Sequence, residues 1–208
     1  MSNPASTDLE AARTRLTAKG LLQEGDSLSC RLPASGEMLS LVHRVGEPGL
    51  VQRTALEQGA AAMPVHALLY AARQDAGAAL LARLPWAGAL AVSRDTMPGV
   101  FDEQLRHLGA RVRPIKAIAP AAVADGANAY ITPQGVLCIG MTLERLIFNA
   151  ELLEKCAKAY VLARVSGHAV GTIPWLVRWI ATGRLRRDQR RAGEHHARGE
   201  AAPRSVGY

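Results

Sequence analysis

His66 and Tyr70 are the two residues best placed for proton transfer, because they lie four apart in a stretch of helical composition that Pro64 opens. Residues four apart share one helix face, so the two side chains can point the same way. The ordinary pKa of histidine, about 6.5, suits a general acid or base near neutral pH. The sequence therefore allows an acid–base role for His66 with Tyr70 beside it. The alternative is that both are packing residues with satisfied polar tips.

A second polar row belongs to a predicted strand. Ser27, Ser29 and Arg31 alternate with apolar residues, and a period of two predicts a half-buried strand. Residues 33–36 predict a turn and residues 37–43 a returning strand, so a hairpin is expected. The polar row can contact a ligand or simply face solvent.

The histidines and cysteines do not have the spacing of a metal site, which needs three or four nitrogen, sulfur or oxygen donors in tetrahedral reach. No His-x-His and no Cys-x-x-Cys occurs in the chain. The six histidines are His43, His66, His107, His168, His195 and His196. Cys30, Cys138 and Cys156 have apolar neighbours, so we expect buried free thiols in a reducing compartment.

The elements that must position these residues alternate along the chain. A first helix is expected from a cap at Ser6 or Thr7 to about Lys19, after a disordered segment 1–6. Helices are also predicted at 64–74 and 101–108, and strands at 78–83, 111–115 and on both sides of a turn within 129–140. This alternation is typical of a layered α/β or α+β domain, which we expect over residues 7–182.

Two helices close that domain. Thr142 is a predicted N-cap, and helical spacing of apolar residues follows it until Gly167. A last amphipathic helix is predicted at 173–181, with Trp175 and Trp179 one turn apart. The two tryptophans can cover the chain's own core or contact a partner. Residues 183–208 have little to bury and are expected to form a basic, flexible tail.

Composition limits the classes of protein that the chain can represent. Hydrophobic residues make up 49% and charged residues 21%, which suits one globular domain with a sizeable core. Seven arginines against three acids between 184 and 204 account for +4 of the net charge of +7. The tail can bind nucleic acid or anionic lipid weakly, or remain solvated. No secretory signal and no apolar run of ~18 residues occurs, so a cytoplasmic protein without a membrane span is expected.

Three stretches in order resemble the class II aldolase/adducin family and together cover about residues 8–165. GDSLSCRLPASGEMLS is similar to the family's early Ser-x-Arg hairpin. VHALLYAARQDAGAALLARLPWAGALA is similar to its His-x-x-x-Tyr helix, Asp, short strand and alanine-rich helix start. AYITPQGVLCIGMTLERLIFNAELLEKCAKAYVLA is similar to its strand, glycine turn and long helix. The resemblance implies a three-layer αβα sandwich around a largely antiparallel sheet, and a cyclic tetramer with sites between subunits.

The same resemblance locates the family's catalytic centre, where three histidines hold zinc or a similar ion and a glutamate moves a proton. The His-x-His positions correspond to Leu81 and Arg83, the histidine of the His-Gly turn to Gln134 before Gly135, and the glutamate falls near Ala62. Leucine offers no donor, and a guanidinium repels a cation. We therefore expect a divergent member with no metal and no other cofactor.

What remains at these positions can still bind a ligand. Arg83 would stand roughly where the metal charge was and could hold a carboxylate, a phosphate or a developing oxyanion. Gln134 could hydrogen-bond the same group, and the resemblance gives the hairpin a part in binding substrate phosphate. The plainer alternatives are that Arg83 pairs with Asp75 or with a neighbouring subunit, and that Gln134 is only a turn residue.

Two classes of function stay open. In the first, a homo-oligomer, expected to be a tetramer, binds a small anionic or carbonyl compound and performs a lyase- or isomerase-type step without metal. In the second, the chain is a non-catalytic scaffold that uses its last two helices for contacts. A metal-dependent aldolase or decarboxylase with a relocated site is a further alternative.

Overall fold

An eight-stranded sheet organises the computed structural model, which describes residues 4–32, 34–56, 64–167 and 169–203. The strand order is β3-β2-β1-β4-β8-β7-β6-β5. Neighbouring strands are antiparallel except for β6 and β7, which are parallel. The strands are β1 Ser27–Leu32, β2 Glu37–Val42, β3 Gln52–Ala55, β4 Ala78–Ala82, β5 Met97–Pro98, β6 Arg111–Pro114, β7 Ala129–Thr132 and β8 Gly135–Gly140. The predicted hairpin is β1 and β2.

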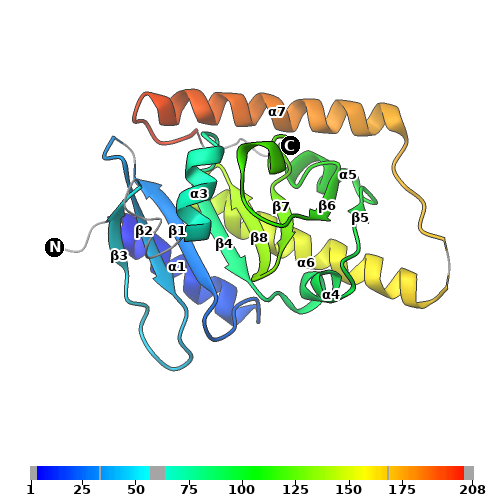
Figure 1. Ribbon diagram of the computed structural model, residues 1–208, viewed down its shortest axis with the longest axis horizontal. Coiled ribbons are helices and arrows are strands. Elements are labelled where there is room, and N and C mark those ends of the chain that lie inside the picture. The colour runs from blue at the N-terminus through cyan, green and yellow to red at the C-terminus, as the bar shows by residue number, and fades with distance from the viewer. Residues whose placement is uncertain (1–3, 33, 57–63, 168, 204–208) are drawn as a thin grey trace.

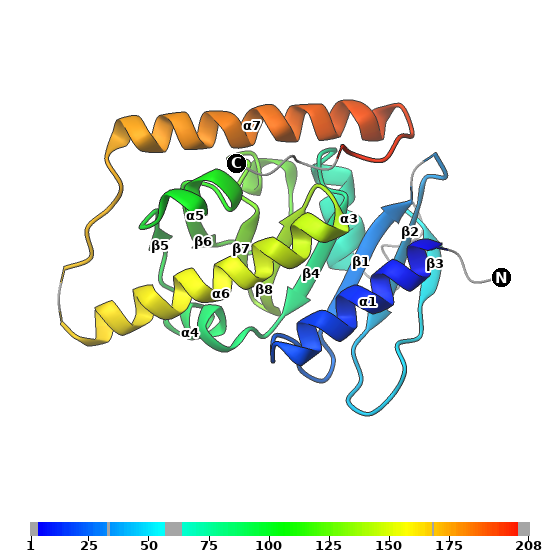
Figure 2. The same cartoon turned by 180° about the vertical axis from the view of Figure 1, so that it is seen from behind.

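One face of the sheet is covered by three helices (Figure 2), α1 Pro4–Ala18, α4 Pro85–Ser93 and α6 Leu143–Val165. Every second residue of the central strands points into this layer, as the period of two requires, for example Leu80 of β4 and Cys138 of β8. Thr142 caps α6 as predicted, because its hydroxyl accepts the backbone N–H of Arg145.

The opposite face carries a smaller core beneath α3 Pro64–Ala72 (Figure 1). Leu69 and Tyr70 of α3 belong to the same buried cluster as Ala79, Tyr130 and Leu137 of the sheet. A single 3-10 turn, Pro120–Ala122, lies in the segment between β6 and β7. Helices on both faces of a mostly antiparallel sheet confirm the expected αβα architecture.

The C-terminal region differs from the prediction of a flexible tail after residue 182. Helix α7 runs over Trp175–Ala197 and lies across one end of the sheet, beside α3 and α5 Asp102–His107 (Figure 1). Leu185, Gln189 and Ala192 are buried on its inner side. The spacing of these residues is helical, but one glutamine and two small or apolar residues among many arginines give too weak an apolar pattern to detect.

The chain ends add two smaller differences. Helix α1 starts at Pro4, so residues 4–6 are helical instead of disordered, while residues 1–3 and 204–208 lie outside the described part. Trp175 and Trp179 are each 69% exposed, so they do not cover the chain's own core. Within the described residues, no helix combines the length and apolarity needed to cross a membrane.

Candidate functional site

The positions that the resemblance assigns to the family's metal-binding centre lie together where β4 ends and β8 begins. They include Leu81, Arg83 and Gly135. Leu81 pairs with Leu137, and Ala82 with Val136. Gly135 has a φ of 148°, and a β-carbon there would lie 2.9 Å from the carbonyl oxygen of Ala82. The same β-carbon would be 3.7 Å from the Cγ of Arg83, so the glycine lets the two strand ends approach closely. Gln134 is exposed in the turn beside them.

Arg83 is tethered by the loop that precedes β1. Its Nε lies 3.4 Å from Oδ1 of Asp26, its backbone N–H donates to the same oxygen at 3.2 Å, and Nη2 donates to the carbonyl of Glu24. The Asp26 side chain is buried, whereas the Arg83 side chain is 56% exposed. The arginine therefore has a fixed inner edge and an outer edge open to solvent.

Sequence reasoning missed Asp26 and suggested Asp75 as the partner of Arg83. In the structure Asp75 pairs with Arg73 instead. The missed signal was the acidic pair Glu24 and Asp26, directly before the strand that carries the serines.

The donor set at this edge does not fit a divalent ion of the family type. The two strand positions hold an apolar side chain, Leu81, and a cation, Arg83, and neither ligates zinc. No group of three or more histidine, cysteine or acidic side chains with metal-binding geometry occurs within the described ranges. Ala62, near which the resemblance puts the family glutamate, lies outside those ranges.

A second set of predicted residues forms a buried hydrogen-bonded cluster between β1 and α3. Ser27 Oγ lies 2.8 Å from Nε2 of His66, and Ser29 Oγ lies 2.7 Å from its Nδ1. Ser29 Oγ also lies 2.8 Å from the hydroxyl of Tyr70. A neutral imidazole has one donor and one acceptor nitrogen, so one serine accepts from the ring and the other donates to it.

Burial sets the charge state of this cluster. Desolvation lowers the pKa of His66 to about 4, and it raises the pKa of Tyr70 well above its ordinary value. Both groups are therefore neutral at pH 7. With both ring nitrogens bonded and the side chain enclosed, the geometry of His66 favours the packing alternative over an exposed acid or base.

Arg31 and Arg83 lie at opposite ends of the neighbouring strands β1 and β4. Arg31 donates through Nη2 to the carbonyl of Tyr70 at 3.0 Å and through Nε to that of Ala76 at 3.1 Å, and its guanidinium stacks on the Tyr70 ring. It lines a cavity of about 420 Å³ with His196, Asp8 and the first residues of α6. The predicted site residues thus form two groups and not one pocket.

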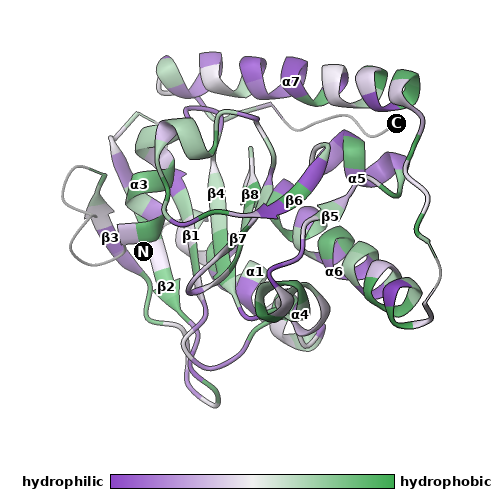
Figure 3. Cartoon of the chain, turned by 45° about the vertical axis from the view of Figure 1, so that its right-hand side comes forward, coloured by the Kyte–Doolittle hydropathy of each residue, from purple (hydrophilic) through white to green (hydrophobic). Residues whose placement is uncertain are grey.

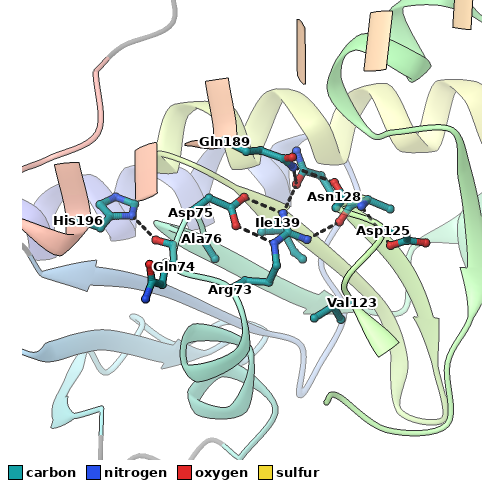
Figure 4. Close-up of polar contacts among 12 residues, drawn as sticks. Arg73, Gln74, Asp75, Ala76, Val123, Asp125, Asn128, Ile139, Gln189 and His196 are labelled. Carbon is teal, nitrogen blue, oxygen red and sulfur yellow. Dashed lines mark hydrogen bonds and ion pairs between the residues drawn. The ribbon is translucent and has the colours of Figure 1, made fainter. Parts of the chain in front are cut away.

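A polar network that the sequence did not single out joins α7 to the body (Figure 4). Arg73 forms a two-point ion pair with Asp75, with both nitrogen–oxygen distances 2.7 Å. Its Nη2 also donates to Oδ1 of Asn128 at 3.1 Å, and the same oxygen accepts from Nε2 of Gln189. Asn128 in turn donates to the carbonyl of His107 at 2.9 Å. Every partner is satisfied, as burial requires.

A model of one known protein family matches more than half of the chain. Residues 36–161 match the family model of the Class II Aldolase and Adducin N-terminal domain. No curated protein sequence matches the chain at a significant level.

Several solved structures share the fold. An L-fuculose 1-phosphate aldolase has a TM-score of 0.67 at 19% identity, over 89% of this chain and 98% of that one. YgbL of Escherichia coli, described as an aldolase, epimerase or decarboxylase, has a TM-score of 0.68 at 17% identity, over 85% and 98%. The L-fuculose 1-phosphate aldolase of Glaciozyma antarctica PI12 has 0.69 at 15% identity, over 95% and 91%. At such identities the likeness establishes the fold alone.

Proposed function

Since the chain belongs to the class II aldolase and adducin family, we propose that it binds a small anionic or carbonyl compound where β4 ends and β8 begins, with Arg83 as the contacting cation. The observation that supports this most directly is the guanidinium of Arg83. By the family resemblance it stands at a position that corresponds to a metal-binding histidine, and it is held by a buried aspartate while its outer edge is exposed.

Arg83 is suited to bind an anion because its orientation is set before a ligand arrives. The Asp26 carboxylate holds the guanidinium through Nε of Arg83. It also accepts hydrogen bonds from the backbone N–H groups of Gln23 and Arg83. A planar guanidinium can donate two parallel hydrogen bonds to a carboxylate or phosphate. The exposed amide of Gln134 lies in the adjacent turn and adds a neutral donor and acceptor.

A metal-independent lyase- or isomerase-type step is the catalytic extension of this proposal. It requires a group that moves a proton at the same edge. Ser27 pairs with Leu81 across β1 and β4, and His66 lies directly behind it. This register supports the Ser27–His66 pair as the proton-moving group, although the low pKa of His66 makes it a weak base.

A non-catalytic oligomeric scaffold is the second candidate. It is favoured by the enclosed, fully bonded state of the His66 cluster and by the exposure of Trp175 and Trp179. In both candidates we propose a homo-oligomer, with a tetramer as the expected form.

Ligand-induced thermal stabilisation separates the candidates. The full-length protein is heated with glyceraldehyde 3-phosphate, lactate or pyruvate, which represent sugar phosphates, hydroxy acids and keto acids. Binding at Arg83 predicts a higher Tm with at least one class, lost in Arg83→Ala and kept in the matched surface variant Arg94→Ala. No shift with any class would favour the scaffold.

Metal content tests the remaining alternative. Mass spectrometry is applied to the untagged full-length protein and to a His195→Gln/His196→Gln variant, which controls for adventitious metal on two adjacent histidines. About one zinc or manganese per chain in both proteins would favour a metal-dependent aldolase or decarboxylase with a relocated site.

A further inference from the structure

The first turns of α7 present an apolar surface to solvent. Trp175 and Trp179 are each 69% exposed, and Leu176, Val177 and Ile180 are between 43% and 50% exposed. Hydrophobic colour appears in these turns in Figure 3, where the helix reaches past the strands toward the segment that joins it to α6. A cluster of this size on one exposed helix marks a contact surface.

The geometry of α7 separates this surface from the side that faces the body. Ala181, Leu185 and Ala192 are buried at helical spacing and define the inner side. Trp175 and Trp179 lie one turn apart and share a different, outward side. Continuing at that spacing, the later turns carry exposed arginines. They are Arg187 and Arg190. The outer face is therefore aromatic at its start and cationic farther along.

A basic hollow lies against the first half of α7. Arg111, Arg178 and Arg186 line a cavity of about 460 Å³ between the start of α7 and the β5–β6 edge. The acidic residue in this lining is Asp125, which already accepts from Arg113 at 2.9 Å and from the hydroxyl of Tyr130 at 2.5 Å. Three arginines therefore line a hollow whose one acidic residue already has hydrogen-bond partners, and such a lining suits a phosphate-sized anion.

We propose that the outer face of α7 docks the protein on a membrane surface that contains anionic phospholipids. Tryptophan prefers the boundary between acyl chains and headgroups, and arginine is attracted to anionic headgroups. Exposed tryptophans and arginines follow one another along the same helix, so α7 would lie on a membrane without spanning it. The Arg111, Arg178 and Arg186 hollow would hold a lipid phosphate. This contact is separate from the ligand proposed at Arg83.

Two other occupants fit less well. A neighbouring copy in a cyclic tetramer would meet this face with a different surface of the same chain, and a chain of net charge +7 offers the arginines more basic than acidic groups. A nucleic acid would use the arginines but leave Leu176 and Ile180 in water, because aliphatic side chains do not stack on bases. The combination of aliphatic, aromatic and cationic groups therefore favours a lipid surface.

Co-sedimentation with vesicles tests the proposal on the full chain. We expect binding to vesicles of phosphatidylcholine mixed with phosphatidylglycerol, weakened by salt, and little binding to phosphatidylcholine alone. Trp175→Ala/Trp179→Ala and Arg178→Glu/Arg186→Glu should each weaken binding about tenfold or more. Matched controls are Leu50→Ala/Val92→Ala, which removes exposed apolar groups elsewhere, and Arg94→Glu/Lys116→Glu, which makes the same charge change elsewhere. Both controls should bind like the wild type.

Three results would overturn the proposal. One is an equal loss of vesicle binding in the controls and the α7 variants, which would mean that net charge or general hydrophobicity decides binding. Another is no vesicle binding together with binding of glycerol 3-phosphate or of a DNA oligonucleotide, which would assign the arginines to a free anion or a nucleic acid. The third is no vesicle binding together with an oligomer, seen by sedimentation velocity, that Trp175→Ala/Trp179→Ala dissociates. Circular dichroism and Tm confirm that each variant is folded.

Discussion

Gln189 of α7 donates through Nε2 to Oδ1 of Asn128, 3.1 Å away and 61 positions earlier in the chain. The same Nε2 lies 2.7 Å from the carbonyl oxygen of Gly126. A glutamine that donates to one buried and one partly buried acceptor is a structural part of the domain, and so is the helix that carries it.

Gln189→Ala should therefore destabilise the protein. The substitution leaves the carbonyl of Gly126 and one lone pair of Asn128 without a donor, at a cost of about 1–3 kcal/mol. Urea unfolding followed by circular dichroism measures the change in the free energy of unfolding. Arg190→Ala, the exposed neighbour, is the control and should change it little. Equal effects of the two substitutions would show that Gln189 does not anchor α7.

Arg73→Leu should have a larger effect than the loss of Gln189. Arg73 and Asp75 are both largely buried, and removing one partner leaves the other as an uncompensated charge, which costs about 3–5 kcal/mol. The exposed pair of Arg53 and Glu37 provides the control, since Arg53→Leu removes an ion pair that water already screens. Thermal unfolding of both variants gives the comparison. A similar Tm for the two would contradict a buried network.

The architecture was accessible from the sequence because it rests on strong local patterns. The alternation through Ser27, Ser29 and Arg31 located β1, and Thr142 located the start of α6. The family resemblance then supplied the order of layers. Helix α7 was missed beyond residue 181 because its stability comes from Gln189 and from small buried residues, whose contribution depends on partners more than 60 positions away.

The stability of the protein should fall as the pH is lowered from about 6.5 to about 4. His66 has a folded pKa of about 4, because burial disfavours its charged form, against about 6.5 when unfolded. In that window the unfolded chain binds a proton that the native state does not. This difference in pKa corresponds to about 3 kcal/mol of folding stability. That stability is present above pH 6.5 and is lost as the pH falls toward 4.

His66→Gln should flatten this dependence. Part of the slope will remain, because desolvation, together with the positive charges of Arg145 and Arg106, also lowers the pKa of His107 to about 4. Chemical unfolding of wild type and variant at a series of pH values gives both slopes, and His195→Gln is the control. An unchanged slope in His66→Gln would mean that His66 takes up its proton at the same pH in the native and the unfolded chain.

Two glycines should respond oppositely to alanine. A β-carbon at Gly77 would overlap the carbonyl oxygen of Met141, a backbone atom that cannot move aside cheaply, so Gly77→Ala should cost about 3 kcal/mol or more. Gly183 lies inside α7 with open space around it, and Gly183→Ala should stabilise by about 1 kcal/mol through helix propensity. Differential scanning calorimetry compares the two. A stabilising Gly77→Ala would contradict the close approach of β4 to the end of β8.

The candidate site was only partly accessible from the sequence. The resemblance brought Leu81, Arg83 and Gly135 to one place, and strand pairing explains why they meet. Asp26 was not recognised as the partner of Arg83, because an ion pair across 57 positions leaves no periodic signal. The alternation of Ser27, Ser29 and Arg31 located the strand but could not show that the serines are buried against His66.

The position of α7 after all eight strands also sets an order of events during synthesis. Asn128 and Arg73 emerge from the ribosome well before Gln189, and the oxygen of Asn128 gains its second donor only when that last helix has been made. Until then the nascent domain exposes the Leu185-facing side of its body, a surface that a chaperone can recognise. Completion of the fold is thus tied to translation of its most arginine-rich segment.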